Sequence, residues 1–228
     1  MKYLTQMTTG RVTRLLGACA LLAGGAGAAG LLTAGTASAA ACGTATEAGT
    51  ACTTGGSADL TGGLLTLTAP AALSWGTVLN GADQELVDTT TADQTLGVVD
   101  ATGTGAGWNI SASATQFTTG GDTPLTLAAA TTLSINGAAA GVQTDTTAPD
   151  GSCLAGSTCV VPTNALAGDY PIAITTTAAP IFEAALGTGE GSIVIGAVDP
   201  VGWWVNVPAD TAAGTYTSTI TLELATGP

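Results

Sequence analysis

The chain has 228 residues and a formal net charge of −13, because 16 acidic side chains are set against 3 basic ones and there is no histidine. The three basic residues are Lys2, Arg11 and Arg14, so no basic side chain follows Arg14. Nucleic-acid binding is thereby disfavoured, since nothing after Arg14 could neutralise phosphates. Hydrophobic residues make up 46% of the chain and charged residues only 8%, which indicates a packed core rather than a disordered polymer.

The N-terminal 39 residues have the pattern of a secretory signal peptide. Lys2, Arg11 and Arg14 precede an apolar run over 15–35, and Ala37-Ser38-Ala39 is a small-residue cleavage site. We therefore expect residues 1–39 to be removed, leaving an extracellular protein that begins at Ala40 and has no membrane association. An uncleaved membrane anchor is the alternative, because the run is about long enough to span a bilayer.

The number of cysteines that would remain after cleavage is consistent with export. Cys42, Cys52, Cys153 and Cys159 form an even set, as expected for disulfides in an oxidising compartment. Their spacings favour Cys42–Cys52 and Cys153–Cys159, although three connectivities are possible. We expect residues 40–60 to form a small polar arm closed by the first bridge, and residues 61–228 to form one domain.

Short apolar or β-branched runs between turn signals fill the rest of the chain. They predict strands, in chain order, at 64–68, 86–87, 96–99, 108–117, 125–127, 133–135, 170–176, 192–198, 201–207 and 216–224, and an extended stretch at 73–78. Asn80-Gly81 and Asn136-Gly137 are tight-turn signals. With no helical apolar stripe after the signal, the pattern predicts an all-β fold, specifically an immunoglobulin-like antiparallel β-sandwich.

Two of these strands alternate most clearly. Trp108, Ile110, Ala112 and Ala114 share one face of an extended chain, and Tyr216, Ile220, Leu222 and Leu224 share one face of the last strand. We expect the two strands to pair. A glycine loop, Gly103-Thr104-Gly105-Ala106-Gly107, directly precedes Trp108 and allows the chain to turn sharply there.

These stretches resemble the two signatures of the WxL family. The first signature, an acid and a glycine-rich loop before Gly-Trp-x-Leu, is matched by Asp100, Gly107, Trp108 and Ile110. The second is matched by Tyr216, Ile220, Leu224 and Pro228, while Leu222 stands where the family has tryptophan. Leu73-Ser74-Trp75-Gly76 is similar to a further family segment.

The resemblance implies a secreted, non-catalytic surface protein that associates non-covalently with the Gram-positive cell wall. The implied partners are the wall glycan, with peptidoglycan as ligand, or other surface proteins. A structural subunit of a surface fibre, coat or layer is the alternative, because the segments 205–208 and 213–216 are also similar to the ends of pilin- and spore-coat-like sandwiches. Such subunits self-associate by strand addition.

Exposed tryptophan rings would suit sugar stacking, so Trp204, Trp75 and Trp108 are candidate ligand residues. Trp204 is the leading candidate because it points away from Trp203 on an extended chain, towards either the opposite face or solvent. Core packing is the competing interpretation, and it is strongest for Trp108 and Trp203.

Catalysis is not expected. No histidine or lysine is available as a base after Lys2. The remaining carboxylates that could pair, Glu183, Glu190, Asp199 and Glu223, have no recognisable context. We expect no cofactor and no metal. A calcium ion at a turn acid such as Asp122, Asp145 or Asp150 is the open alternative, because oxygen ligands are abundant.

Overall fold

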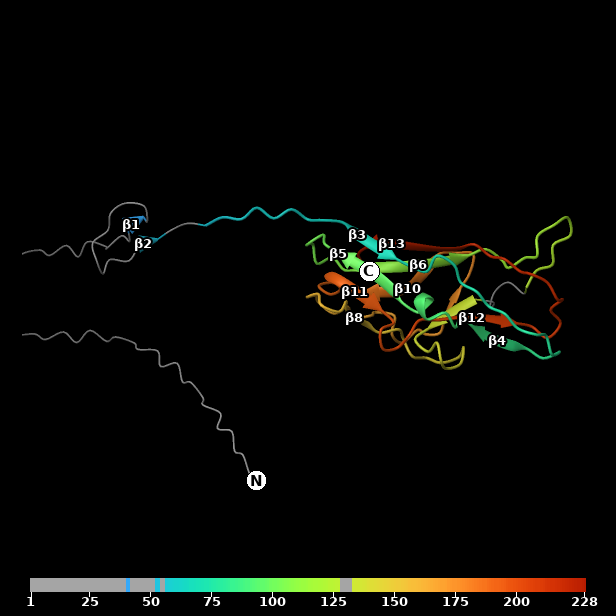
Figure 1. The fold of residues 1–228 in the computed structure, drawn as a ribbon. Helices are drawn as coiled ribbons and strands as arrows, with labels where there is room; N and C mark the ends of the chain where they lie inside the picture. The colour runs from blue at the N-terminus through green and yellow to red at the C-terminus, as the bar shows by residue number, and fades with distance from the viewer. Residues whose placement is uncertain (1–39, 42–51, 54–55, 128–132) are drawn as a thin grey trace, which may run out of the picture. The chain divides into compact units, whose positions relative to one another are not determined.

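A computed structural model of the chain describes residues 40–41, 52–53, 56–127 and 133–228, and it separates into two units, 1–58 and 59–228 (Figure 1). In the described part of the first unit, β1 (Ala40–Ala41) pairs in parallel with β2 (Cys52–Thr53). The predicted signal peptide and Cys42 lie outside the described residues. The signal peptide and the Cys42–Cys52 bridge therefore stay predictions.

The second unit is built from three antiparallel sheets. The first has the order β3 (Leu65–Thr68), β5 (Leu96–Asp100), β11 (Gly191–Ile195), β8 (Gly151–Cys153). The second has the order β4 (Gln84–Val87), β12 (Gly202–Val207), β7 (Leu133–Asn136), β9 (Ile172–Ile174). The third places β6 (Trp108–Ala114) between β10 (Ala179–Ala184) and β13 (Ile220–Thr226).

The only helical segment in the described part of the chain is a single 3-10 turn, η1 (Thr91–Asp93). The predicted all-β class and antiparallel sandwich are confirmed. The narrower immunoglobulin-like topology stays a prediction.

The expected pairing of the two alternating strands is confirmed. In β6 the residues alternate between buried and half-buried, starting with buried Trp108. The register with β13 places Ile220 opposite Ala114, Leu222 opposite Ala112 and Leu224 opposite Ile110. Both apolar faces therefore point to the same side of the sheet, which is what a shared core requires.

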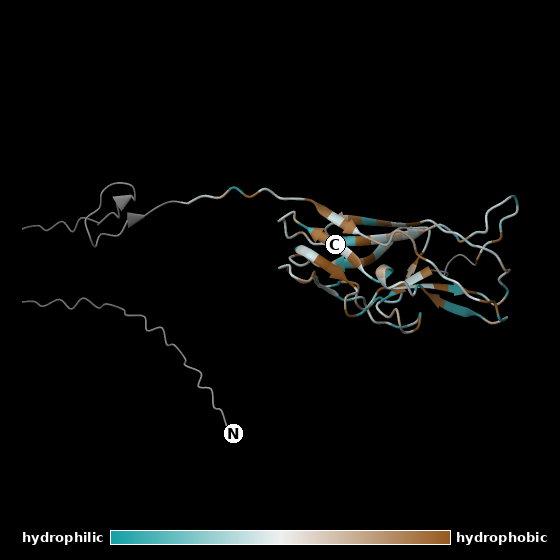
Figure 2. Cartoon of the chain, viewed as in Figure 1, coloured by the Kyte–Doolittle hydropathy of each residue, from teal (hydrophilic) through white to brown (hydrophobic). Residues whose placement is uncertain are grey.

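The core lies among the three sheets, and Figure 2 shows the brown apolar stretches concentrated on their strands. The Trp108 ring stacks on Phe182 of β10, with ring centroids 5.6 Å apart and an interplanar angle of 19°. Trp203 of β12 is fully buried, and its Nε1 donates to the Asp93 carbonyl at 2.8 Å. Aromatic rings are few in this chain, so these two tryptophans supply a large share of the buried ring surface.

The stretch predicted to be extended at 73–78 lies between β3 and β4 and joins no sheet. Hydrogen bonds to two residues of other segments hold it in place. The Ser74 N–H donates to the buried Asp88 carboxylate at 2.7 Å, and Trp75 Nε1 donates to the Trp203 carbonyl at 2.9 Å. Its apolar alternation therefore marks contact with the core rather than pairing.

Two differences between the predicted and the observed strands have local causes. The strand predicted at 125–127 is reduced to an isolated bridge between Thr126 and Thr118. Strand β10 was not predicted, because Pro180 and a register shift after it interrupt the pattern of a regular strand.

The residues between β7 and β9 form a long excursion. It contains β8 and the Cys153–Cys159 disulfide, with Cα atoms 5.5 Å apart, as expected from the spacing. Its first part folds back on β7, where the Asn136 side chain donates to the carbonyl oxygens of Val142, Gln143 and Asp145 at 3.0–3.3 Å. At the end of this part the Thr147 side chain and N–H bond to the Asp145 carboxyl group, which lowers its pKa.

Candidate functional site

The glycine loop between β5 and β6 is a structural junction. Asp100 is buried, and its carboxylate accepts from the Thr102 hydroxyl at 2.7 Å and the Thr102 N–H at 3.0 Å. This local hydrogen bonding turns the chain at the end of β5. Gly107 has φ = +72°, and a Cβ there would lie 2.4 Å from the Ala184 carbonyl oxygen, so only glycine fits.

The loop also joins two other parts of the chain. Trp108 Nε1 donates to the Gly189 carbonyl at 2.9 Å, which ties the start of β6 to the turn after β10. The Gly227 N–H donates to the Gly107 carbonyl at 2.9 Å, and Asn109 Nδ2 donates to the Gly227 carbonyl at 2.7 Å. The first-signature residues Asp100, Gly107 and Trp108 thus hold together a loop, a turn and the C-terminal segment.

The candidate ligand residues have different surroundings. Trp108 is fully buried and Trp204 is 4% exposed, so neither ring faces solvent. Of the two directions left open for Trp204, the opposite face or solvent, solvent is not the one taken, because the ring is buried and its Nε1 donates to Asn136 Oδ1 at 2.9 Å. Trp75 is the half-buried one of the three, and it faces a groove.

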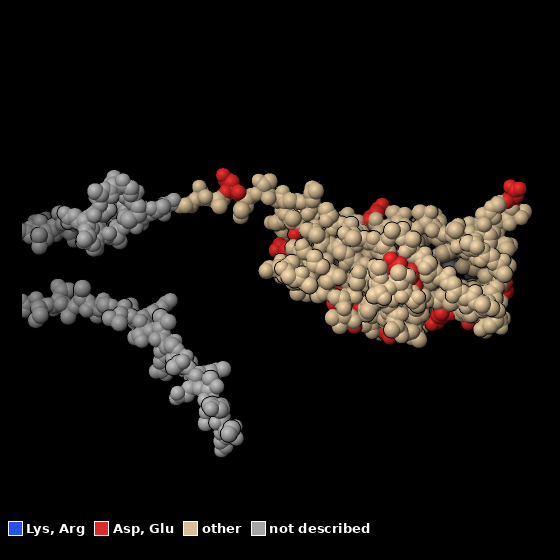
Figure 3. Space-filling view, in the orientation of Figure 1, with Lys and Arg blue, Asp and Glu red and all other residues tan. Residues whose placement is uncertain are grey.

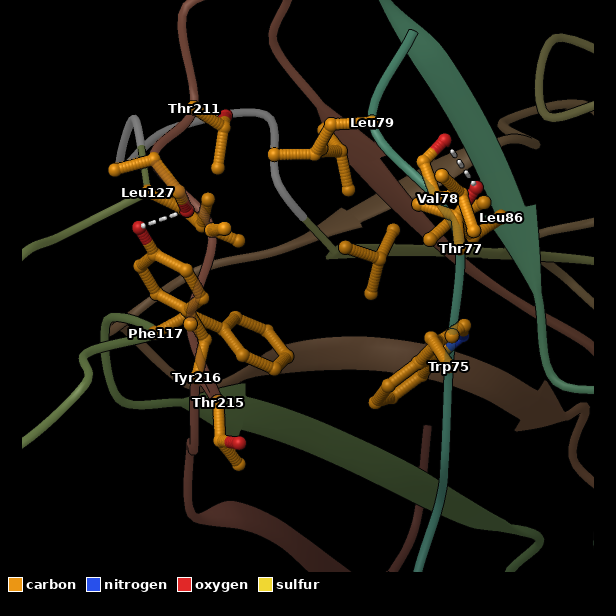
Figure 4. A pocket seen from close by; sticks show the side chains of 16 residues that line it. Trp75, Thr77, Val78, Leu79, Leu86, Phe117, Leu127, Thr211, Thr215 and Tyr216 are labelled. Carbon is orange, nitrogen blue, oxygen red and sulfur yellow. Dashed lines mark hydrogen bonds between the residues drawn. The ribbon is translucent and has the colours of Figure 1, made fainter.

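We call this depression of about 620 Å³ the aromatic groove. Figure 4 shows Trp75 on one side and Phe117 with Tyr216 on the other. Trp75 and Phe117 make an edge-to-face contact, with ring centroids 5.8 Å apart and an interplanar angle of 80°. The groove is lined by residues 75–79 and 211–216, together with Leu86, Phe117, Leu127, Val205 and Val207.

Hydroxyl groups surround this apolar floor. Thr77 lies on the side of Trp75, and Thr211 and Thr215 lie on the side of Tyr216 (Figure 4). The Tyr216 hydroxyl donates to the Ala212 carbonyl at 3.0 Å, which fixes the ring edge against its own loop. The arrangement can take a ligand with a flat apolar face and hydroxyl groups at its edges.

A second depression, the edge groove, adjoins the first and shares Trp75, Phe117 and Tyr216 with it. It has a volume of about 540 Å³ and lies between residues 70–75 and residues 216–220. Leu222, which replaces the tryptophan of the second signature, lines it together with Ile220 and Trp203. The second-signature residues Tyr216, Ile220 and Leu222 are therefore brought together here, while Leu224 packs against the core.

No acidic residue lines either groove, although the chain carries 16 of them. Figure 3 shows the acidic atoms as scattered red groups on the face in view. In a protein with this charge, an uncharged groove favours an uncharged ligand surface, since a carboxylate at its rim would meet no compensating cation.

Two other features are absent from the residues that the structure describes. Within them there is no cluster of three histidine, cysteine, aspartate or glutamate side chains that could hold a metal ion. Nor does any helix among them have the length and apolar character needed to cross a membrane.

Phe117 and the 211–215 loop were not predicted as site residues. Phe117 follows the end of β6, which ends at Ala114, and its position opposite Trp75 depends on long-range packing. The threonines of the loop have no local signal that distinguishes them from the many other threonines of the chain. Tyr216 was predicted as a motif residue, but its place beside a groove could not be read from the motif.

Comparison with known proteins identifies the family of this chain. Residues 51–228 match the model of the WxL domain, described as surface cell wall-binding. No curated protein and no solved structure matches. Because the match covers well over half of the chain, this protein belongs to the WxL family, as the two signatures predicted. It is therefore a cell-wall-associated surface protein, located outside the cell.

Proposed function

We propose that this protein is a non-catalytic wall-binding module that holds peptidoglycan in the aromatic groove. The observation that carries the proposal is the groove itself, which combines partly exposed Trp75 and Tyr216 rings with threonine hydroxyls and has no charged lining. Sugar rings present an apolar C–H face and a hydroxyl edge, so they fit both features.

The non-catalytic part of the proposal follows from the same residues. Neither groove holds a carboxylate pair, and the chain after Arg14 has no histidine or lysine that could act as a base. Binding by ring stacking and hydroxyl hydrogen bonds needs none of these groups. A single groove of this kind binds weakly, so retention on the wall would depend on the high density of glycan there.

The fluorescence of Trp75 offers a direct test. Trp108, Trp203 and Trp204 are at most 4% exposed, so Trp75 is the tryptophan that a quencher in solution reaches best. Soluble peptidoglycan fragments should change the emission and protect it from acrylamide, and Trp75→Ala should abolish both effects. Leu154→Ala, at an exposed site outside both grooves, is the control. Undiminished quenching at saturating fragment would contradict the proposal.

The second candidate function is that of a self-associating structural subunit. It is favoured by β13, which pairs only with β6 among the described strands and leaves its other edge beside the edge groove. An extended segment added there would continue the sheet. Leu60, which is 94% exposed on the segment before β3, is the described apolar side chain best placed to serve as an anchor from a second copy.

The dependence of assembly on protein concentration distinguishes the two functions. A strand-adding subunit should form filaments in electron micrographs as its concentration rises, and Leu60→Asp should prevent them. A chain that stays monomeric and still binds wall fragments supports the glycan function alone.

A further inference from the structure

The chain contains two Asn-Gly pairs, Asn80-Gly81 and Asn136-Gly137, which look alike in the sequence. Both are turn signals, and both are also the residue pair most prone to chemical change at the asparagine. Glycine has no Cβ, so its backbone nitrogen can approach the preceding side-chain amide with little hindrance. The structure gives the two pairs opposite surroundings.

Asn80 and Gly81 are both exposed, in the turn between the aromatic groove and β4. Gly81 has φ = +78°, and a Cβ at that position would meet nothing within 4 Å. The Asn80 Oδ1 accepts from the Ala82 N–H at 2.9 Å, which polarises the side-chain carbonyl. In the described part of the chain, the Gly81 N–H has no hydrogen-bond acceptor and is free to react.

Asn136 is fully buried, and its amide is held on both ends. Its Nδ2 donates to three carbonyls, and its Oδ1 accepts from the Ala138 N–H at 3.1 Å and from Trp204 Nε1 at 2.9 Å. The Gly137 N–H donates to the Thr147 carbonyl at 2.7 Å, and a Cβ on Gly137 would lie 2.3 Å from Ala148. Neither reacting group can move towards the other without breaking this packing.

We propose that Asn80 is a site of spontaneous deamidation in the folded protein, and that Asn136 is protected. The Gly81 nitrogen attacks Asn80 Cγ and loses its proton, the bond between Cγ and Nδ2 breaks, and ammonia leaves. Water then opens the resulting cyclic imide at either carbonyl and yields aspartate or isoaspartate. Water is the only co-reactant, and no atom changes its oxidation state.

The change would act on the aromatic groove, and this consequence rests on the proposed function. Val78 and Leu79, which line the groove, immediately precede Asn80. Both products place a carboxylate one residue beyond the lining of a groove that has no charged side chains, and isoaspartate also lengthens the backbone by one atom. The aged protein should therefore bind the wall less tightly than the fresh protein.

Peptide mapping of the protein from Ala40 onwards tests the modification. After incubation at mildly alkaline pH, chymotryptic peptides should show conversion of Asn80 that grows with time, while Asn136 stays unchanged. In concentrated guanidinium chloride with reductant, both sites should convert at similar rates, because the protection of Asn136 comes from the fold. Conversion of Asn136 at the rate of Asn80 in the native protein, or a native Asn80 as stable as Asn136, would overturn the proposal.

Two variants test the consequence separately. Asn80→Asp carries one product from the start, and Asn80→Gln keeps the amide but cannot readily form the five-membered imide. Asn80→Asp should show a severalfold loss of binding to purified walls relative to Asn80→Gln. Equal binding of the two would overturn the effect on the groove, whereas a failure of fresh wild-type protein to bind walls at all would overturn the proposed function instead.

Discussion

At the scale of single residues, Tyr170 gives the clearest case of burial changing the chemistry of a side chain. Its hydroxyl donates to the Ile181 carbonyl and accepts from Asn164 Nδ2 at 3.3 Å. Burial raises the pKa of Tyr170 to about 12, because the phenolate would lose its hydration in the core. The hydroxyl is thus held in its neutral form next to the strand that carries Phe182.

The raised pKa of Tyr170 predicts that the folded protein loses stability at alkaline pH. Tyrosine ionises near pH ~10 in an unfolded chain, so the contribution of Tyr170 to the free energy of unfolding should be constant below that pH and should fall as the pH rises towards 12. After Arg14 there is no lysine, and Tyr170 and Tyr216 are the only tyrosines, so few other groups titrate in this window.

Urea unfolding across this pH range measures the effect. Tyr170→Phe should be less stable at neutral pH, since it loses the bond to Ile181, but its stability should depend less on alkaline pH. Tyr216→Phe, which removes a hydroxyl whose hydrogen bond to Ala212 is exposed, should keep the wild-type dependence. A wild type without alkaline loss of stability, or identical behaviour of the two variants, would contradict the role of Tyr170.

At the scale of elements, the glycine loop before β6 can be tested by two matched substitutions. Gly103 and Gly107 have similar backbone angles, with φ = +67° and +72°. A Cβ on Gly103 would meet nothing within 4 Å, whereas one on Gly107 would lie 2.4 Å from the Ala184 carbonyl oxygen. The two positions therefore share the conformational strain and differ in the steric clash.

Gly103→Ala should lower the free energy of unfolding by about 1–2 kcal/mol, the usual cost of a left-handed alanine. Gly107→Ala should lose roughly a further 1–3 kcal/mol, because the loop and the end of β10 must move apart. Chemical denaturation of both variants measures the difference. Equal losses would mean that the close approach of loop and strand does not matter for stability.

The elements also show what the sequence could predict. The pairing of β6 with β13 was predictable because both strands alternate cleanly and their apolar faces must meet. The bridge Cys153–Cys159 was predictable from short spacing. Whether residues 73–78 would join a sheet was not predictable, since an extended segment becomes a strand only if a partner strand is adjacent. Here hydrogen bonds to Asp88 and Trp203 hold the segment without such a partner.

The candidate site was less predictable than the fold. Trp75 was among the candidate ligand residues, but Trp204 was preferred to it, because alternation shows that Trp204 leaves the Trp203 face and cannot show that its ring is buried there, bonded to Asn136. The aromatic groove joins residues 75–79 to residues 211–216, and no local pattern links segments so far apart in the chain.

At the scale of the whole molecule, the charge determines how the protein responds to salt. All 16 acidic residues lie after position 46 and no basic residue follows Arg14, so the folded unit has repulsive pairs and no side-chain salt bridges. The melting temperature should rise with NaCl, because the Debye length falls from roughly 30 Å at 0.01 M to roughly 8 Å at 0.15 M. Calorimetry checks this, and a melting temperature that falls with NaCl over this range would contradict it.

We propose attachment of this WxL protein to peptidoglycan through the aromatic groove. It is tested most directly by co-sedimentation of the protein from Ala40 onwards with purified, protein-free Gram-positive cell walls, beside Trp75→Ala and the control Leu154→Ala. We predict that wild type and Leu154→Ala sediment with the walls and that Trp75→Ala, with an unchanged circular dichroism spectrum, remains in solution. Sedimentation of Trp75→Ala at the wild-type level would contradict the claim and place the wall contact elsewhere on the domain.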